Sequence, residues 1–183
     1  MTYAPKKYIM LYEIIYILRF NMLIPTFLGK DTDKMNRRQT REAALCMIFN
    51  YSFHTEGDGS EQLELYLENF QDKDAKNISE ELRQDEYFTK AYFGVISNIT
   101  ELDEIIASCS KKWSSARISR VSKSILRLAL YEILYMKDIP SQVSINEAVE
   151  LAKKFDSDES YSFVNGILGA YVRSTEGNDS KEE

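Results

Sequence analysis

The sequence is poor in the residues that build catalytic and metal sites. Its 183 residues include a single histidine, His54, and two cysteines, Cys46 and Cys109. One histidine argues against a metal or catalytic site based on histidine, because such sites combine several ligands or partner groups. No glycine-rich phosphate loop, serine–histidine pair or cluster with metal-ligand spacing occurs either. The sequence therefore predicts a protein that is not an enzyme and needs no cofactor or metal.

Residues that interrupt helices are also scarce. The chain has three prolines and seven glycines, whereas a many-stranded sheet would need more of both for its turns. The hydrophobic share of 44% suffices for one domain with a core, or for two small packed layers of helices. The two cysteines lie far apart in apolar helical patterns, which favours buried, reduced thiols of a cytoplasmic protein over a disulfide. An all-α protein is predicted.

Charged residues are distributed unevenly along the chain. The net charge of −6 argues weakly against a nucleic-acid partner. Residues 56–86 hold eleven acids and three bases, whereas residues 105–131 hold six bases and no acid. Because binding of a polyanion depends on the field of one face more than on total charge, RNA is not excluded. The basic stretch 111–127 fits a path for RNA and an ordinary solvated face equally well.

Residues 1–34 differ from the rest. The run 8–28 is largely apolar but contains Glu13 and Arg19, and charges inside a membrane span are costly. Three interpretations remain open: an amphipathic anchor, a weak membrane segment, or an N-terminal extension that is not part of the native protein. The last is favoured, because a convincing domain begins at Met35. No membrane partner is therefore expected.

Apolar residues at three- and four-residue spacing predict a series of helices within residues 35–173. The predicted helices cover residues 38–53, 63–70, 85–109, 119–136, 144–155 and 160–173. A polar loop is expected over 71–78, and the acidic tail, 174–183, is expected to be disordered. A capping box from Ser144 to Glu147 is expected to start the fifth helix.

Three arginines stand at the start of the first predicted helix. Arg37, Arg38 and Arg41 are three and four residues apart, so they can share one edge of its first turns. Cations at a helix N-terminus oppose the helix dipole, which costs about 0.3–1 kcal/mol each. Either this cost is tolerated because an anion binds there, or the cluster is a solvated charged start.

Four short stretches form a recognisable set. They are 37–42 (RRQTRE), 126–132 (LRLALYE), 143–153 (VSINEAVELAK) and 163–168 (FVNGIL). The last three, in this order and at these spacings, resemble the C-terminal half of the NusB family of transcription antitermination factors, and the first resembles that family's arginine-rich start. The likeness covers residues 35–173. It implies an all-α, NusB-like helical bundle of two packed helical subdomains.

The resemblance implies a function in transcription. It predicts binding to boxA, a single-stranded element of ribosomal RNA transcripts, together with NusE, the transcription name of a small-subunit ribosomal protein. The pair joins the RNA polymerase elongation complex with other Nus factors, and some members form homodimers that hide the RNA surface. A helical protein–protein adaptor without RNA binding is the alternative. A fused RNA cytosine methyltransferase is excluded, because its glycine-rich cofactor loop is absent.

The resemblance also implies which residues meet RNA. Arginines at the helix start suit phosphate and base contacts, and an aromatic side chain suits stacking on a base. The predicted RNA-binding residues are Arg37, Arg38, Arg41, Lys123, Glu159, Phe163 and Asn165. Phe49 and Ser122 stand at positions expected to meet NusE, where the family usually has a tyrosine and a glutamate.

Overall fold

The computed structural model describes residues 35–53, 59–68, 73–112, 118–157 and 159–179. The elements are α2 (Arg37–Tyr51), α3 (Gly59–Glu68), α4 (Lys73–Gln84), α5 (Glu86–Ser97), α6 (Ile99–Cys109), a 3-10 turn (Ser110–Lys112), α7 (Arg120–Tyr135), α8 (Ser141–Phe155) and α9 (Ser160–Asp179). Within these ranges there is no strand, so the all-α prediction is confirmed. The N-terminal extension, residues 1–34, lies outside the described residues.

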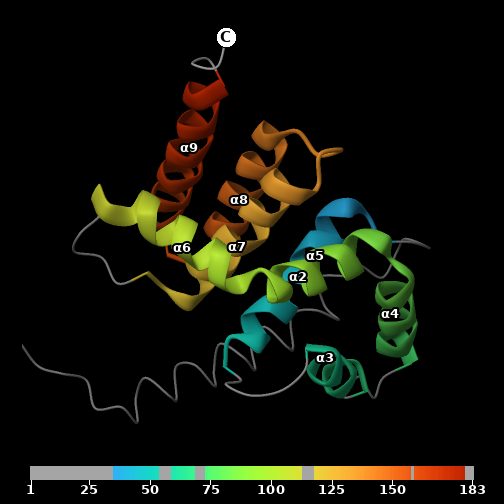
Figure 1. The fold of residues 1–183 in the computed structure, drawn as a ribbon. Coiled ribbons are helices and arrows are strands. Elements are labelled where there is room, and N and C mark those ends of the chain that lie inside the picture. Colours follow the sequence, from blue (N-terminus) through green and yellow to red (C-terminus); the bar gives the residue numbers. More distant parts are fainter. Residues whose placement is uncertain (1–34, 54–58, 69–72, 113–117, 158, 180–183) are drawn as a thin grey trace, which may run out of the picture.

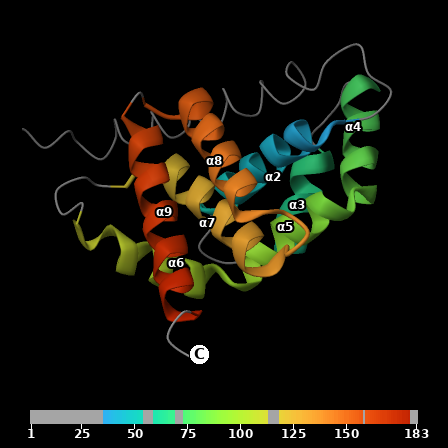
Figure 2. The same cartoon turned by 90° about the horizontal axis from the view of Figure 1, so that it is seen from above.

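The helices form two groups that pack against each other. Helices α2–α5 lie on one side of the molecule and α6–α9 on the other (Figure 1). Helix α7 joins the groups, because it packs against α2 and α5 as well as against α6, α8 and α9. Seen from above, α4 lies at one end of the molecule, and α6 and α9 lie at the other (Figure 2). This arrangement fits the predicted pair of packed helical subdomains.

The core is continuous across the two groups. Leu45 of α2, Phe88 of α5 and Ile125 of α7 are almost completely buried, and so is Ile167 of α9. Burial of an aliphatic or aromatic side chain stabilises a fold by about 1.5–3 kcal/mol. Packing demands a glycine at Gly94 in α5, since a Cβ there would lie 1.9 Å from the Tyr131 ring of α7.

Side-chain caps set where the key helices begin. Asn36 accepts a hydrogen bond from the backbone N–H of Gln39 at 3.0 Å, and Gln39 accepts from the backbone N–H of Asn36 at 2.8 Å. This reciprocal capping box starts α2 just before Arg37. Ser119 caps α7 by accepting from the N–H of Ser122 at 2.9 Å.

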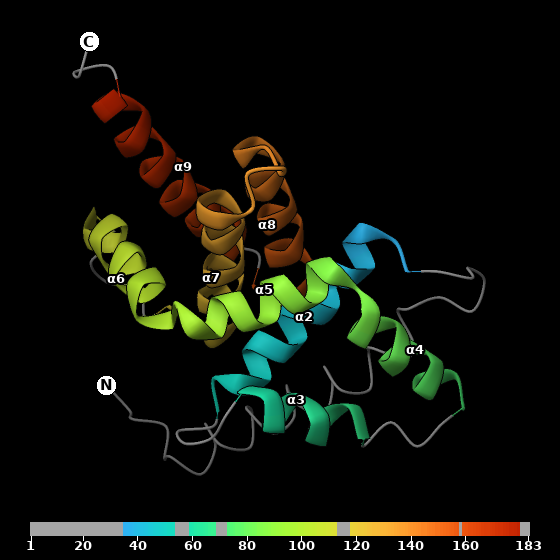
Figure 3. The same cartoon turned by 45° about the vertical axis from the view of Figure 1, so that its right-hand side comes forward.

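Several predicted boundaries are wrong. The long helix over 85–109 is two helices, α5 and α6 (Figure 3). The Asn98 side chain donates to the Gly94 carbonyl oxygen at 2.7 Å, and its backbone N–H donates to the same oxygen at 3.2 Å, which closes α5 there. The loop predicted over 71–78 lies largely in α4, whose polar residues form a solvated helix over a few buried ones. Helix α9 extends past 173 to Asp179, and residues 180–183 of the tail lie outside the described residues.

The capping box predicted at Ser144 is also wrong. Helix α8 begins at Ser141 after Pro140, which presets the backbone for a helix start. Ser144 therefore lies inside the helix, where it is buried.

No helix in the described part of the chain is long and apolar enough to span a membrane.

Candidate nucleic-acid interface

The first turn of α2 presents two arginines at the surface. Arg37 and Arg38 are exposed, and the guanidinium of Arg37 lies 4.7 Å from the centre of the Tyr87 ring on α5. Arg38 approaches Glu150 of α8 at 3.7 Å and Glu42 of α2 at 4.0 Å. Both arginines thus lie where a polyanion can reach them.

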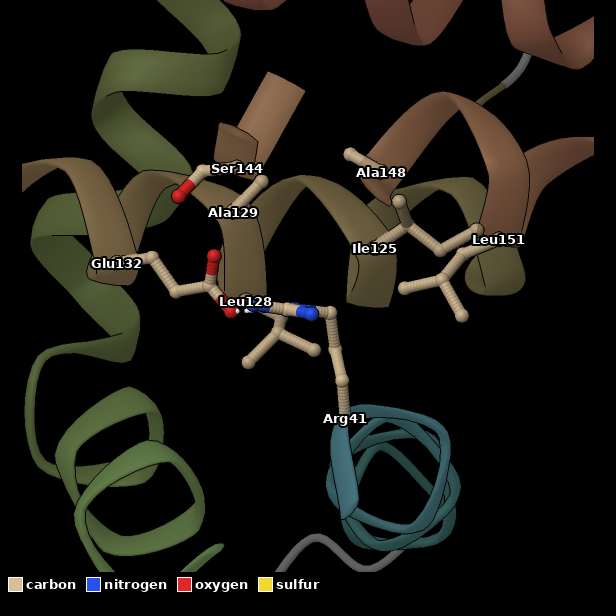
Figure 4. A pocket seen from close by; sticks show the side chains of 8 residues that line it. All are labelled: Arg41, Ile125, Leu128, Ala129, Glu132, Ser144, Ala148 and Leu151. Carbon is tan, nitrogen blue, oxygen red and sulfur yellow. Dashed lines mark hydrogen bonds and ion pairs between the residues drawn. The ribbon is translucent and has the colours of Figure 1, made fainter. Parts of the chain in front are cut away.

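Arg41 points the other way, into the interface between the two groups of helices (Figure 4). Only 4% of it is exposed. Its Nε donates to Glu132 Oε1 of α7 at 2.8 Å, and its Nη1 lies 3.3 Å from Glu147 Oε2 of α8. The Tyr87 hydroxyl donates to the same oxygen of Glu132. The predicted contact between Arg41 and RNA does not fit this geometry, because Arg41 is buried and paired with internal carboxylates.

The groups of this buried cluster shift one another's pKa values. Burial disfavours the charged form of Arg41, but the oxygens of Tyr87, Glu132 and Glu147 outweigh burial and raise the pKa of the guanidinium. Burial first, and then the Glu132 carboxylate, raise the pKa of Tyr87 well above its usual range. Arg41 is therefore a cation, and Tyr87 a neutral donor, at physiological pH.

Helix α8 adds two lysines beside the exposed arginines. Lys153 Nζ lies 2.7 Å from Glu150 Oε1, and Lys154 Nζ donates to both carboxylate oxygens of Glu42 at 2.7 Å. Ion pairs with Glu150 and Glu42 therefore link both lysines to Arg38. We call Arg37, Arg38, Glu150, Lys153 and Lys154 the α2–α8 surface.

The predicted residues at the start of α9 lie in different environments. Glu159 and Asn165 are exposed. Phe163 is half-buried and packs against the hydrophobic core. Its neighbour Tyr161, which the sequence reasoning missed, is 40% exposed, with Lys153 Nζ 5.7 Å from its ring centre. The sequence did hold a sign of this exposure, because Tyr161 is not among the apolar residues that form the inward face of the predicted helix 160–173.

The basic stretch 111–127 does not form one surface in its described part. Lys123 and Arg127 both pair with Asp103 of α6, at 2.8 Å. Arg120 donates to the carbonyl oxygen of Ser52 at 2.9 Å and so caps the C-terminus of α2. These three cations hold helices together, and Lys123 lies with Asp103 rather than on the α2–α8 surface.

The two residues predicted to meet NusE are internal in this structure. Phe49 is buried, and its ring packs edge-on against Phe53 at 4.9 Å. Ser122 is buried, and its hydroxyl donates to Asp156 Oδ2 at 2.5 Å. The prediction of a partner surface at these side chains does not fit this structure, because neither reaches the exterior.

The stabilisation from the ion pairs of Asp103 with Lys123 and Arg127 should depend on pH. Partial burial opposes ionisation of Asp103, but hydrogen bonds from Arg127 and Lys123 outweigh it and lower the pKa of the carboxyl. Because the folded-state pKa lies below the unfolded value of about 3.9, the stabilisation is present above that pH and is lost as the pH falls through the folded-state pKa. We expect Asp103→Asn to lower the free energy of unfolding by about 1 kcal/mol at pH 7.

Urea unfolding of both proteins at pH 7 and near pH 3 checks this expectation. The difference between wild type and variant should shrink at the lower pH. Glu86→Gln, which breaks the exposed pair with Lys90, is the control and should cost less at pH 7 than Asp103→Asn, because water screens an exposed pair. An equal loss for Asp103→Asn at both pH values would contradict the prediction.

The described residues contain no group of three or more histidine, cysteine, aspartate or glutamate side chains that could hold a metal ion. Cys46 and Cys109 are free thiols, and burial raises the pKa of Cys46 well above its usual range. The thiol of Cys46 therefore packs in the core and does not act as a nucleophile. What the surface offers instead is exposed guanidinium and ammonium groups beside an exposed aromatic ring.

Comparison with known proteins identifies the family to which this fold is similar. The NusB family matches residues 38–173. The transcription antitermination protein NusB of Clostridium acetobutylicum is 40% identical over 142 residues, which cover 78% of this chain and 98% of that protein. The NusB structure of T. maritima is similar with a TM-score of 0.59 and 36% identity, over 76% of this chain and 92% of that one.

A complex is among the similar structures. The crystal structure of antitermination factors NusB and NusE in complex with dsRNA is similar with a TM-score of 0.58 and 25% identity. The match covers 75% of this chain and 96% of that chain. The NusB-like character of the helical bundle is thereby confirmed.

Proposed function

Since this chain belongs to the NusB family of transcription antitermination proteins, we propose that it binds boxA-type single-stranded RNA of ribosomal RNA transcripts together with NusE. The observation that carries the proposal is the match to a curated antitermination protein over nearly that protein's whole length. The family is one of transcription factors, so the prediction that the chain is not an enzyme is confirmed.

The α2–α8 surface supports RNA as the ligand. Arg37 and Arg38 offer planar guanidinium groups that can donate two hydrogen bonds to one phosphate. Exposed Tyr161 lies next to Lys153, so an aromatic ring accompanies the cations. Single-stranded RNA is bound through its backbone charge and through stacking of its unpaired bases, and this surface has groups for both. Glu159 and Asn165 lie exposed at the same end of α9.

The partners follow from the same proposal. A protein partner that buries part of the surface next to the RNA raises the effective affinity of both ligands. A similar structure has NusB and NusE together with RNA. We propose that NusE joins this chain in the cytoplasm, that the pair enters the RNA polymerase elongation complex with other Nus factors, and that a homodimer is a state in which the RNA surface is covered.

A second candidate is a helical adaptor that binds only protein. The observation in its favour is that Arg41, Lys123 and Arg127 are all paired with carboxylates of neighbouring helices. The α2–α8 surface has four basic residues, two arginines and two lysines. Glu150 and Glu42 partly neutralise the two lysines. Under this candidate, RNA would bind weakly and without preference for sequence.

A fluorescence-anisotropy titration separates the two. The protein is titrated against a labelled boxA-type single strand, a scrambled strand and a duplex of the same sequence, each with and without NusE. We expect preference for the boxA-type strand and tighter binding when NusE is present. Equal affinities for all three RNAs, unaltered by NusE, would favour the adaptor.

A further inference from the structure

We propose that Arg38, Lys153 and Tyr161 form a binding subsite for one nucleotide of a single-stranded RNA, in which the Glu150 carboxylate holds the place of a phosphate until RNA arrives. The inference rests on the proposed function and adds to it a specific site. It also assigns a role to an acid that lies within a surface otherwise suited to a polyanion.

Two cations from different helices converge on one carboxylate. Arg38 Nη2 lies 3.7 Å from Glu150 Oε2, and Lys153 Nζ lies 2.7 Å from Glu150 Oε1. Each cation therefore meets a different oxygen of the same group. A phosphate also offers several oxygens to neighbouring donors, so it can take both contacts from the carboxylate.

All three charged side chains are accessible. The exposed fractions are 53% for Arg38, 49% for Lys153 and 45% for Glu150. The hydrogen bond from Lys153, followed by the charges of Lys153 and Arg38, lowers the pKa of Glu150, so the group is ionised at neutral pH. Exposed ion pairs are weak and exchange readily, because water screens them. A polyanion can therefore displace this carboxylate without disturbing the core.

An aromatic ring lies near the same lysine, Lys153. Tyr161, in the first turn of α9, is 40% exposed, and the Lys153 ammonium is 5.7 Å from its ring centre. Lys153 thus lies within reach of both a carboxylate and a ring face. A nucleotide has the same pairing of groups, with a charged phosphate and a flat base joined by a sugar. Stacking of unpaired bases on aromatic residues is a general feature of single-strand recognition.

Phe163 fits this role less well than Tyr161. Phe163 is half-buried against the core, so part of its ring is already covered by the protein. Tyr161 lies two residues earlier and joins, through Lys153 and Glu150, the chain of contacts that begins at Arg38. The geometry therefore favours Tyr161 as the ring on which a base stacks.

The roles of Glu150 and Tyr161 predict effects of opposite sign. Glu150→Gln removes the competing charge and frees both cations, so RNA binding should tighten about 3- to 5-fold at low salt, with a steeper dependence on salt. Tyr161→Leu removes the ring and should weaken binding about 5- to 10-fold, whereas Tyr161→Phe should retain the wild-type affinity.

The chain offers matched controls on α6 and at the C-terminal end of α7. Glu101 is an exposed carboxylate that accepts from Tyr135, and Tyr135 is 46% exposed. Glu101→Gln makes the same change of charge as Glu150→Gln, and Tyr135→Leu the same loss of a ring as Tyr161→Leu. Both controls should stay within about 2-fold of wild type, since neither residue belongs to the α2–α8 surface and salt screens an exposed charge outside it.

The experiment is a fluorescence-anisotropy titration of the full chain, wild type and variants, with a labelled boxA-type single strand at several salt concentrations. Thermal melts verify that each variant is folded. Tighter binding by Glu150→Gln together with weaker binding by Tyr161→Leu supports the subsite. If wild type binds RNA but both variants match their controls, the subsite is wrong and the proposed function stands. If wild type binds no RNA, both proposals fail.

Discussion

Replacing Arg41 by leucine should destabilise the fold by about 3–5 kcal/mol, although the residue belongs to an arginine cluster at a helix start. The change leaves Glu132, which is almost completely buried, as a charge without its cation. Glu132 Oε2 already has no hydrogen-bond partner among the described residues, so the Tyr87 hydroxyl would remain its main donor. Urea unfolding at pH 7, followed by circular dichroism, measures the loss.

Two further variants test this cause. Arg38→Leu, from the same helix turn, removes an exposed cation and should change stability little. Arg41→Leu combined with Glu132→Leu removes both charges and should recover much of the loss, because an apolar pair of similar volume can replace a buried ion pair. A small loss for Arg41→Leu, or no recovery in the double variant, would show that the pair does not hold α2 to α7.

The fold class was predictable because helix periodicity is a local property. Apolar residues three and four apart mark the faces of α2, α7 and α9, and the structure buries residues of each. The break at Asn98 was not predictable in this way. The apolar stripe continues through it, and the helix is closed by hydrogen bonds from the Asn98 side chain and backbone N–H to the Gly94 carbonyl, which the stripe does not report.

The candidate site was predictable only in part, because pairing between distant residues decides which cations are exposed. Arg37, Arg38 and Arg41 look equivalent in the sequence. Of the three, only Arg41 is itself buried, and its partner Glu132 is 91 residues away. The partner of Lys123 is hidden from the sequence in the same way, because Asp103 lies on another helix, α6. No local pattern reports such partners.

Replacing both Arg37 and Arg38 by alanine should weaken binding to a boxA-type single strand by at least about tenfold at low salt and flatten its salt dependence. Each phosphate contact of a single strand contributes about 0.7 to the slope of log K against log salt. Loss of two such contacts should therefore lower the slope by about 1.4. Folding should survive, because both side chains are exposed and the capping box of Asn36 and Gln39 is untouched.

The measurement is a set of anisotropy titrations at four or more salt concentrations, and Lys123→Ala is the matched control. Lys123 was predicted from the sequence to bind RNA, but its ammonium lies 2.8 Å from Asp103, which also binds Arg127. If the α2–α8 surface carries the RNA, Lys123→Ala should keep nearly the wild-type slope. If Lys123→Ala lowers the slope and the double variant does not, RNA follows α7 instead. Because each cation that contacts a phosphate adds to the salt slope, the difference in slope between the two variants reports which cations meet phosphate.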